Sequence, residues 1–251
     1  MWKAIVFAGA VTLAAVPARA AAPIVLSCTA TTDCASAFAA ANQGFFAKHG
    51  LEVKITPIAL NSNIPAALVS GSIQIGGPTP SVFLQAVDGG LDLVGLASAS
   101  VTNKEVADGA AAVARPGAGI EKPADFPGHR MGVPGIGAFL DVLFRQSLLQ
   151  HGIDPGRITF VEVTFPTMSD ALKSGAVDGV VSADPFLSRI VAAGTGKVVS
   201  HFLADIPDNE PVILYASTGA WAKSHPQEVA AFRAAIAEGA AFVHAHPDTA
   251  R

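Results

Sequence analysis

An internal duplication constrains the fold of this chain more than any other feature of its sequence. Three short segments recur in the same order, with the second copies shifted by 102, 104 and 105 residues. The pairs are 49–51 (HGL) with 151–153 (HGI), 67–71 (ALVSG) with 171–175 (ALKSG), and 79–80 (TP) with 184–185 (DP). One such match carries little weight, because Gly commonly follows a helix. Three matches at nearly constant spacing predict two similar lobes.

Each lobe is predicted to alternate strands and helices, from the periodicity of its apolar residues and from its capping residues. In the first lobe we expect strands at 24–26, 51–58 and 73–76, and helices at 35–48, at 63–69 and from Pro80 onward. In the second we expect strands at 130–133, 158–163 and 177–182, and helices at 138–150, at 169–174 and after Asp184. Strands linked by helical crossovers pair in parallel sheets that helices cover on both faces, so the fold class is α/β.

Two further apolar strands, 110–114 and 212–215, fit neither repeat. We expect them to carry the chain out of the first lobe and back into it. Lobe 1 would then comprise residues 21–118 and 207–251, and lobe 2 residues 119–206. The Pro- and Gly-containing stretches at 115–120 and 206–211 are the expected hinges.

The first twenty residues have the layout of a secretory signal peptide. One Lys precedes an apolar run at 4–16, which is too short to span a bilayer, and Ala18 and Ala20 are the small residues that a signal peptidase reads. The mature chain is expected to begin at Ala21, in the periplasm. The run Leu26-Ser27-Cys28 allows a weaker lipoprotein alternative.

Charge and cysteine content narrow the possible partners and compartments. Charged residues make up 14% of the chain, the net charge is −4 and there is no basic patch, so a nucleic-acid partner is not expected. The two cysteines, Cys28 and Cys34, are a disulfide candidate in an oxidising compartment. Two free thiols remain the alternative.

The residues expected at the carboxyl ends of the strands share one chemistry. Ligands of open α/β sheets bind at these ends, where helix N-termini offer unpaired N–H groups. Most residues of these loops are small, hydroxylated or glycine. The predicted ligand-binding residues in them are Thr29, Thr31, Ser62, Thr79, Ser98, Gly135, Ile136, Gly137, Phe165 and Asp184. Caps and turns favour the same residue types, and that reading stays open for each position alone.

Asp184 and Thr79 occupy matching places in the two lobes but differ in charge, and this difference in charge predicts which end of a ligand faces each lobe. Thr79 is neutral, whereas Asp184 would place a carboxylate at its helix end and cancel part of the positive field there. We therefore expect a donor or cationic group of the ligand at Asp184 and an acceptor end at Thr79 and the N–H groups near Gly135 and Gly137. Phe165 would form an apolar wall. The alternative is that Asp184 only caps its own helix.

Catalytic motifs are missing from the sequence. There is no Gly-x-Ser-x-Gly elbow and no His-Glu-x-x-His helix, and Cys34 has no evident base. The Gly135-Ile136-Gly137 loop lacks the third glycine of a dinucleotide fingerprint, whose place is taken by Leu140. No catalytic residue, metal or cofactor is therefore expected.

Several of these segments together resemble a known family. They are 45–53 (FFAKHGLEV), 67–71, 120–133, 171–179 and 184–185, within a resemblance that covers residues 24–250. The family is that of periplasmic solute-binding proteins of the nitrate, sulfonate and taurine type, which also includes thiamine pyrimidine-precursor binders. The resemblance implies a type II periplasmic-binding fold and a monomer. It also implies a small ligand (sulfonate-like, carboxylate-like or aminopyrimidine-like) that is delivered to the permease and ATPase subunits of an ABC importer.

Two departures from the family pattern qualify these expectations. Family members usually continue for several dozen residues beyond the element that His246-Pro247 resembles, so this chain is expected to be truncated or minimal. The Gly135-Ile136-Gly137 loop lacks a hydroxyl, so an oxyanion hydrogen bond is expected to be missing there. A ligand sensor without a transporter is one alternative. A pyrimidine-synthase-like enzyme is another, which a missing lysine disfavours.

Overall fold

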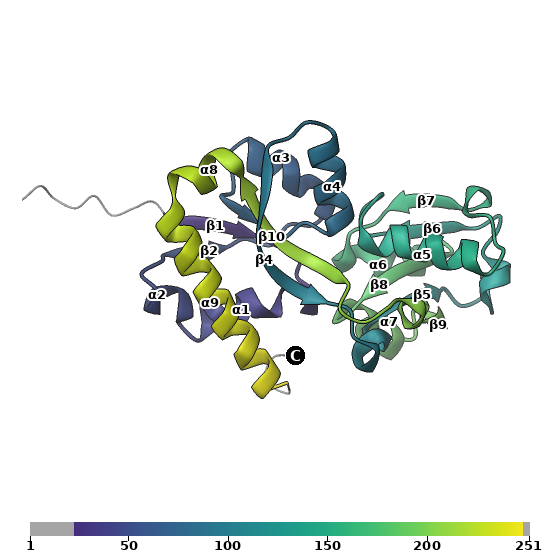
Figure 1. Cartoon of the computed structure of the whole chain (residues 1–251). Helices are drawn as coiled ribbons and strands as arrows, with labels where there is room; N and C mark the ends of the chain where they lie inside the picture. Colours follow the sequence, from purple (N-terminus) through teal and green to yellow (C-terminus); the bar gives the residue numbers. More distant parts are fainter. Residues whose placement is uncertain (1–22, 248–251) are drawn as a thin grey trace, which may run out of the picture.

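Two five-stranded sheets, each covered by helices, make up the part of the chain that the computed structural model describes, residues 23–247 (Figure 1). The expected signal peptide and its cleavage site lie outside these residues. Within them, no helix is long and apolar enough to cross a membrane.

The first sheet has the strand order β2-β1-β3-β10-β4. β1, β2 and β3 run parallel, while β10 is antiparallel to both β3 and β4. Its strands are β1 (Ile24–Ser27), β2 (Val53–Ile55), β3 (Ile75–Gly76), β4 (Leu93–Val101) and β10 (Pro211–Thr218). Its helices are α1 (Ala35–Asn42), α2 (Phe45–Lys48), α3 (Ile64–Val69), α4 (Pro80–Asp88), α8 (Gly219–Ser224) and α9 (Pro226–Ala245). α1, α2 and α9 pack together on one face and α3 and α4 on the other (Figure 1).

The second sheet repeats this plan in the order β7-β6-β8-β5-β9. β6 is parallel to β7 and β8, and β5 is antiparallel to β8 and β9. Its strands are β5 (Ala110–Ala114), β6 (Arg130–Val133), β7 (Thr159–Glu162), β8 (Gly179–Ala183) and β9 (Lys197–Ser200). Its helices are α5 (Phe139–Gln150), α6 (Met168–Ser174) and α7 (Phe186–Ala192). Both sheets are therefore mixed. The sequence had predicted sheets that are parallel throughout, and this prediction is wrong for the pairs that β5 and β10 form with their neighbours.

The position of β5 corrects the expected lobe boundary. Residues 110–114 were assigned to lobe 1, but β5 pairs along its whole length with β8 of the second sheet. The chain therefore changes sheets between β4 and β5, and residues 115–120 already lie in the second lobe. The return crossing does run through 206–211, between β9 and β10.

Thr102 joins the two crossings. Its backbone N–H donates to the Glu210 carbonyl at 2.8 Å, and its carbonyl accepts from Asn209 N–H at 2.9 Å. Its hydroxyl donates to the Pro207 carbonyl at 2.6 Å and accepts from Glu210 N–H at 2.9 Å. The two segments that connect the lobes are thus held side by side.

Local sequence explains most element boundaries. Gly44, at φ 74°, separates α1 from α2, so the expected single helix over 35–48 is broken; this left-handed conformation is one that glycine adopts without steric cost. Thr79 caps α4 as expected, by accepting a hydrogen bond from Val82 N–H. β4 and β9 were not expected, and β4 (LVGLASASV) is rich in small residues that rarely favour strands.

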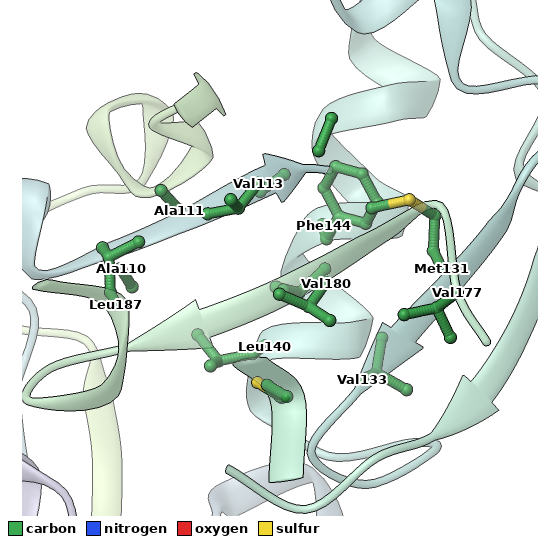
Figure 2. Close-up of a cluster of buried hydrophobic side chains, with 14 of the residues drawn as sticks. Ala110, Ala111, Val113, Met131, Val133, Leu140, Phe144, Val177, Val180 and Leu187 are labelled. Atoms are coloured by element: carbon green, nitrogen blue, oxygen red, sulfur yellow. The ribbon is translucent and has the colours of Figure 1, made fainter. Parts of the chain in front are cut away.

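Each lobe has its own apolar core. In the second lobe, β5 and β8 are buried along their whole lengths, because helices cover both faces of this sheet. Phe144 of α5 packs there with Met131 of β6 and Val180 of β8 (Figure 2). In the first lobe, α9 packs against α1, and Phe46 stacks on Phe232 at 5.9 Å between ring centroids.

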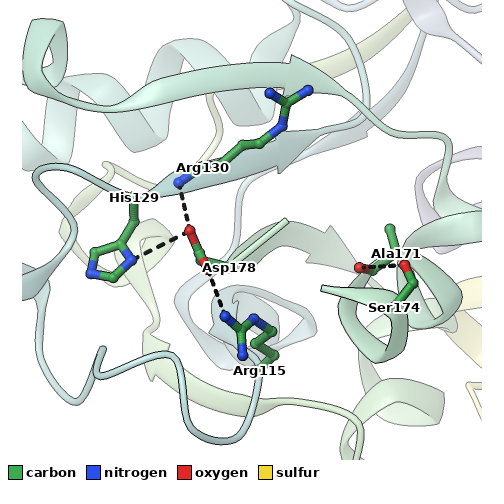
Figure 3. Close-up of polar contacts among 6 residues, drawn as sticks. All are labelled: Arg115, His129, Arg130, Ala171, Ser174 and Asp178. Atoms are coloured by element: carbon green, nitrogen blue, oxygen red, sulfur yellow. Dashed lines mark hydrogen bonds and ion pairs between the residues drawn. The ribbon is translucent and has the colours of Figure 1, made fainter. Parts of the chain in front are cut away.

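Asp178 ties three strands together at one end of the second sheet (Figure 3). Its carboxylate accepts from Arg115 at 3.0 Å and from the Arg130 backbone N–H at 3.0 Å, and it lies 3.4 Å from His129. Partial burial alone would raise the pKa of Asp178, but the bonds from Arg130, Arg115 and His129 outweigh it and lower the pKa. This network lies at one end of β5 and β8, and Asp184 lies at the other end of the same two strands.

Candidate functional site

A cavity of about 40 Å³ lies where the two lobes meet. Both lobes contribute to its walls, and most of the polar groups come from the first. The lining residues are Thr29, Thr31, Asp33, Asn61, Thr79, Val212 and Ile213 from the first lobe, and Pro134, Ala138, Phe139, Leu140 and Phe165 from the second. Pockets that bind ligands of drug-like size measure about 300–1,000 Å³, so the interlobe cavity is small in this conformation.

The loop after β1 supplies three of the polar groups, and a disulfide closes it. Cys28 and Cys34, both fully buried, are bonded to each other with Cα atoms 6.4 Å apart. The Thr29 and Thr31 hydroxyls lie 3.3 Å apart inside this loop. Because the Cys28 sulfur is engaged in the bridge, the structure argues against the lipoprotein alternative.

Asn61 connects two other parts of the wall. Its amide nitrogen donates to the Gly77 carbonyl at 3.0 Å, and its amide oxygen accepts from the Thr79 N–H at 2.8 Å. Both ends of this buried side chain are therefore used internally. They fix the turn that precedes α4 and present the Thr79 hydroxyl at the cavity.

Asp33 is a cavity residue that was not predicted from the sequence. It belongs to the 3-10 turn η1 (Thr32–Cys34), and Ser100 of β4 donates a hydrogen bond to its Oδ1 at 3.4 Å. Burial raises the pKa of the Asp33 carboxyl, although hydrogen bonds from Ser100, Thr31 and its own backbone N–H oppose this rise. Among the described residues that line the cavity, Asp33 alone has an ionisable side chain. Its position directly after the threonine-rich segment was the only available signal.

Aromatic side chains form the opposite wall. Phe165, in the turn η6 (Phe165–Thr167), stacks on Phe186 with ring centroids 5.5 Å apart. Phe139, the first residue of α5, packs against the apolar cores of both lobes. Phe165 was predicted as an apolar wall, whereas Phe139 was not singled out.

Six of the ten predicted ligand-binding residues are not among the lining residues. Ser98 lies inside β4, paired with Leu214, rather than in a loop at the end of a strand. Ser62 lies at the rim, where its hydroxyl donates to Glu162 of the other lobe at 3.3 Å. Asp184 accepts hydrogen bonds from the Ser188 N–H at 3.0 Å and the Ser188 hydroxyl at 2.7 Å, so its carboxylate is engaged at the start of α7.

The Gly135-Ile136-Gly137 loop does not present free N–H groups to the cavity. Ile136 N–H donates to the Glu162 carboxylate at 3.0 Å, and Gly137 N–H donates to Asp141 at 2.8 Å. The expected acceptor site at these N–H groups is therefore filled by the protein's own carboxylates. The contact with Glu162 is tertiary, since β7 brings this residue to the loop, whereas Asp141 lies only four residues after Gly137 in the first turn of α5.

Contacts across the cleft hold the lobes in a closed arrangement. Thr32 N–H donates to the Asp184 carbonyl at 3.3 Å, and Gln85 donates to the Gly137 carbonyl at 3.0 Å. Together with the Ser62–Glu162 bond, these polar contacts join the two lobes.

A larger, open hollow of about 450 Å³ lies at the far end of the second lobe, beside Arg115, Lys173 and Thr195. No residue of the first lobe lines it. The last turn of α6 and the residues Gly194 and Thr195 that follow α7 border it. It is separate from the cleft, and the smaller interlobe cavity is the better candidate site because both lobes build it. Within residues 23–247, no cluster of three His, Cys, Asp or Glu residues is arranged to hold a metal ion.

Comparison with known families matches residues 31–250 to the model described as NMT1/THI5 like. The chain belongs to the NMT1/THI5-like family. This confirms the family resemblance noted in the sequence. A curated relative of this NMT1/THI5-like chain is the bicarbonate transport ATP-binding protein CmpC of Synechocystis, which is 26% identical over 223 residues. That alignment covers 83% of this chain but only 33% of CmpC, so the chain spans about a third of the length of this relative.

Solved structures identify the fold. The alkanesulfonate-binding protein SsuA from Xanthomonas axonopodis pv. citri, bound to MOPS, matches with a TM-score of 0.76 at 16% identity, over 93% of this chain and 78% of that chain. The periplasmic nitrate-binding protein NrtA from Synechocystis PCC 6803 matches with a TM-score of 0.70 at 20% identity, over 86% of this chain and 60% of that chain. The NMT1/THI5-like chain therefore has the periplasmic-binding-protein fold, as expected.

Proposed function

We propose that this protein is the extracytoplasmic solute-binding component of an ABC-type importer, which captures a small organic molecule between its two lobes. The observation that carries this proposal is the cavity at the lobe interface, which residues of both lobes line. Closure of two lobes around a ligand is a recognised mode of capture in periplasmic binding proteins. The family and the fold support the same conclusion.

The related proteins support a transport role and an extracytoplasmic location. SsuA and NrtA are described as binding proteins for alkanesulfonate and nitrate, and NrtA as periplasmic. CmpC is named as a transport ATP-binding protein, and this chain aligns with part of it. A permease and an ATPase are the corresponding partners proposed here. The lining residues that the structure describes offer one carboxyl, three hydroxyl groups and one amide but no histidine or lysine, which favours binding over catalysis.

Mass spectrometry of the ligand carried through native purification tests this proposal. The released compound should rebind, and at a hundredfold excess over its dissociation constant it should stabilise the fold by about 2.7 kcal/mol through mass action. It should be recovered chemically unaltered after incubation. Recovery of a converted product would instead identify an enzyme, and undiminished uptake of the compound by a strain that lacks the gene would favour a sensor.

A further inference from the structure

The charge balance of the interlobe cavity narrows the ligand class. Asp33 faces the cavity, and its carboxylate has only hydroxyl and backbone donors around it. No Lys, Arg or His lies among the described lining residues. Asp33 is partly buried and has no cationic partner among these residues, so its carboxylate bears a desolvation cost that an occupant with a positive charge would relieve.

The groups packed around Asp33 do not supply that charge. β4 and α1 carry no ionisable residue, and β10 carries only Tyr215. The Tyr215 hydroxyl is bonded to Ser36 at 3.0 Å, and burial raises its pKa to about 12. From the other lobe, Asp184 approaches Thr32 through its carbonyl, and it adds a second negative charge near the cleft.

The remaining walls fit a flat, compact group. Phe139 and Phe165 line the cavity opposite the polar loop, and aromatic faces attract cations as well as planar groups. The cavity volume of about 40 Å³ accommodates only a few non-hydrogen atoms beside them. We infer that the ligand presents a small planar cationic group of the amidinium or guanidinium kind to Asp33, between the Thr29–Thr31 hydroxyls and the two phenylalanine rings.

This inference rests on the proposed function and specifies its ligand. It differs from the expectation drawn from the sequence, which placed the cationic group at Asp184. It also predicts that simple anions are disfavoured, because Asp33 and Asp184 would repel them and the N–H groups of Ile136 and Gly137 are already engaged.

Three nearly isosteric probes separate charge from shape. Acetamidinium, acetamide and acetate are planar and carry charges of opposite sign or none. We would titrate each into the mature protein at constant ionic strength and measure the shift in melting temperature, with nitrate, bicarbonate and methanesulfonate in parallel. Probes this small are expected to bind in the millimolar range. Acetamidinium should stabilise the protein, and acetamide and acetate should not.

The variant Asp33→Asn locates the effect. It should weaken acetamidinium binding by on the order of 10- to 100-fold, the range for losing a hydrogen bond to a charged group. In the wild type, affinity should fall as the pH is lowered through the pKa of Asp33, and this dependence should vanish in Asp33→Asn. Asp170→Asn, which removes an exposed carboxylate on α6, is the matched control and should bind acetamidinium like the wild type.

Stability of the ligand-free protein distinguishes this role from a structural one. Because burial raises the pKa of Asp33, the folded state binds this proton more tightly than the unfolded chain. Stability therefore falls as the pH rises through the interval between the unfolded and folded pKa values. Asp33→Asn should leave the ligand-free protein as stable as the wild type at neutral pH, or more so. A merely structural Asp33 would instead be needed for stability.

The possible failures are distinguishable. No stabilisation by acetamidinium, or equal stabilisation of wild type and Asp33→Asn, would overturn the inference. If nitrate, bicarbonate or methanesulfonate stabilised the protein in that case, the inference would fail while the proposed function stood. Chemical conversion of a natural ligand during incubation would refute the proposed function itself, because it would identify the protein as an enzyme.

Discussion

At the scale of single residues, the two carboxylates near the cleft differ in what already satisfies them. Asp184 accepts two hydrogen bonds from Ser188 within the first turn of α7, an arrangement typical of capping. Asp33 faces the cavity and has weaker hydroxyl partners. Equal formal charge therefore does not make these residues equivalent candidates for contact with a ligand.

Asp184→Asn tests this distinction. Asn retains the ability to accept the Ser188 hydrogen bonds, so we expect the free energy of unfolding to change by no more than about 0.5 kcal/mol, as for substitutions that spare such features. Ligand affinity, measured by titration calorimetry with the purified natural ligand, should change little. A fall in affinity of about 1.5–3 kcal/mol with the fold intact would instead place a charged ligand group at Asp184.

At the scale of elements, the contact between α1 and α9 depends on the absence of a side chain. Gly239 of α9 is buried, and a Cβ there would overlap the Ser36 carbonyl oxygen and crowd Ala40 of α1. Helices approach this closely only where one of them presents a very small residue. Glycine at this position therefore serves packing, although it lowers the intrinsic helix propensity.

Gly239→Ala sets these two effects against each other. Propensity alone would stabilise α9 by about 1 kcal/mol, whereas overpacking costs about 1–3 kcal/mol. We expect a net loss of stability in urea unfolding. Ala237→Gly, at an exposed position of the same helix, calibrates the propensity term. A gain in stability for Gly239→Ala would show that α1 and α9 are not packed this closely.

At the scale of the whole molecule, the two lobes are connected by two crossings that Thr102 joins. The side chain is buried, and its hydroxyl both donates to Pro207 and accepts from Glu210. Paired crossings restrict how the lobes move relative to each other. The interlobe bonds of Gln85 and Ser62 must break for the cleft to open, whereas the Thr102 bonds need not.

Thr102→Val keeps the shape of the side chain and removes its hydrogen bonds. Leaving buried partners unsatisfied costs about 1–3 kcal/mol, so we expect lower stability together with a broader distribution of interlobe distances in small-angle X-ray scattering. Thr159→Val, at an exposed position of β7, should change stability by less than about 0.5 kcal/mol. A narrow distribution that matched the wild type would argue that the lobe connection does not depend on Thr102.

Local information in the sequence determined the alternating elements and the duplication. The three repeated segments, the cap at Thr79 and the strand at 110–114 were predictable because caps, turns and apolar periodicity act over a few residues. The order of the elements and the family resemblance then led to the fold class. Four of the lining residues, Thr29, Thr31, Thr79 and Phe165, followed from their places after strands.

Only the tertiary structure decided which strands pair and which charges meet. Residues 110–114 read as a strand in either lobe, and their pairing with β8 depends on contacts about 70 residues away in the chain. Likewise, nothing local to residues 135–137 shows that Glu162, 26 residues after Ile136, occupies the Ile136 N–H group. Asp33 is just as uninformative alone, because its significance comes from Ser100 and from the walls of the other lobe. Hydrogen bonding within an element is local, whereas strand pairing and the electrostatics of a cleft depend on groups that folding brings together.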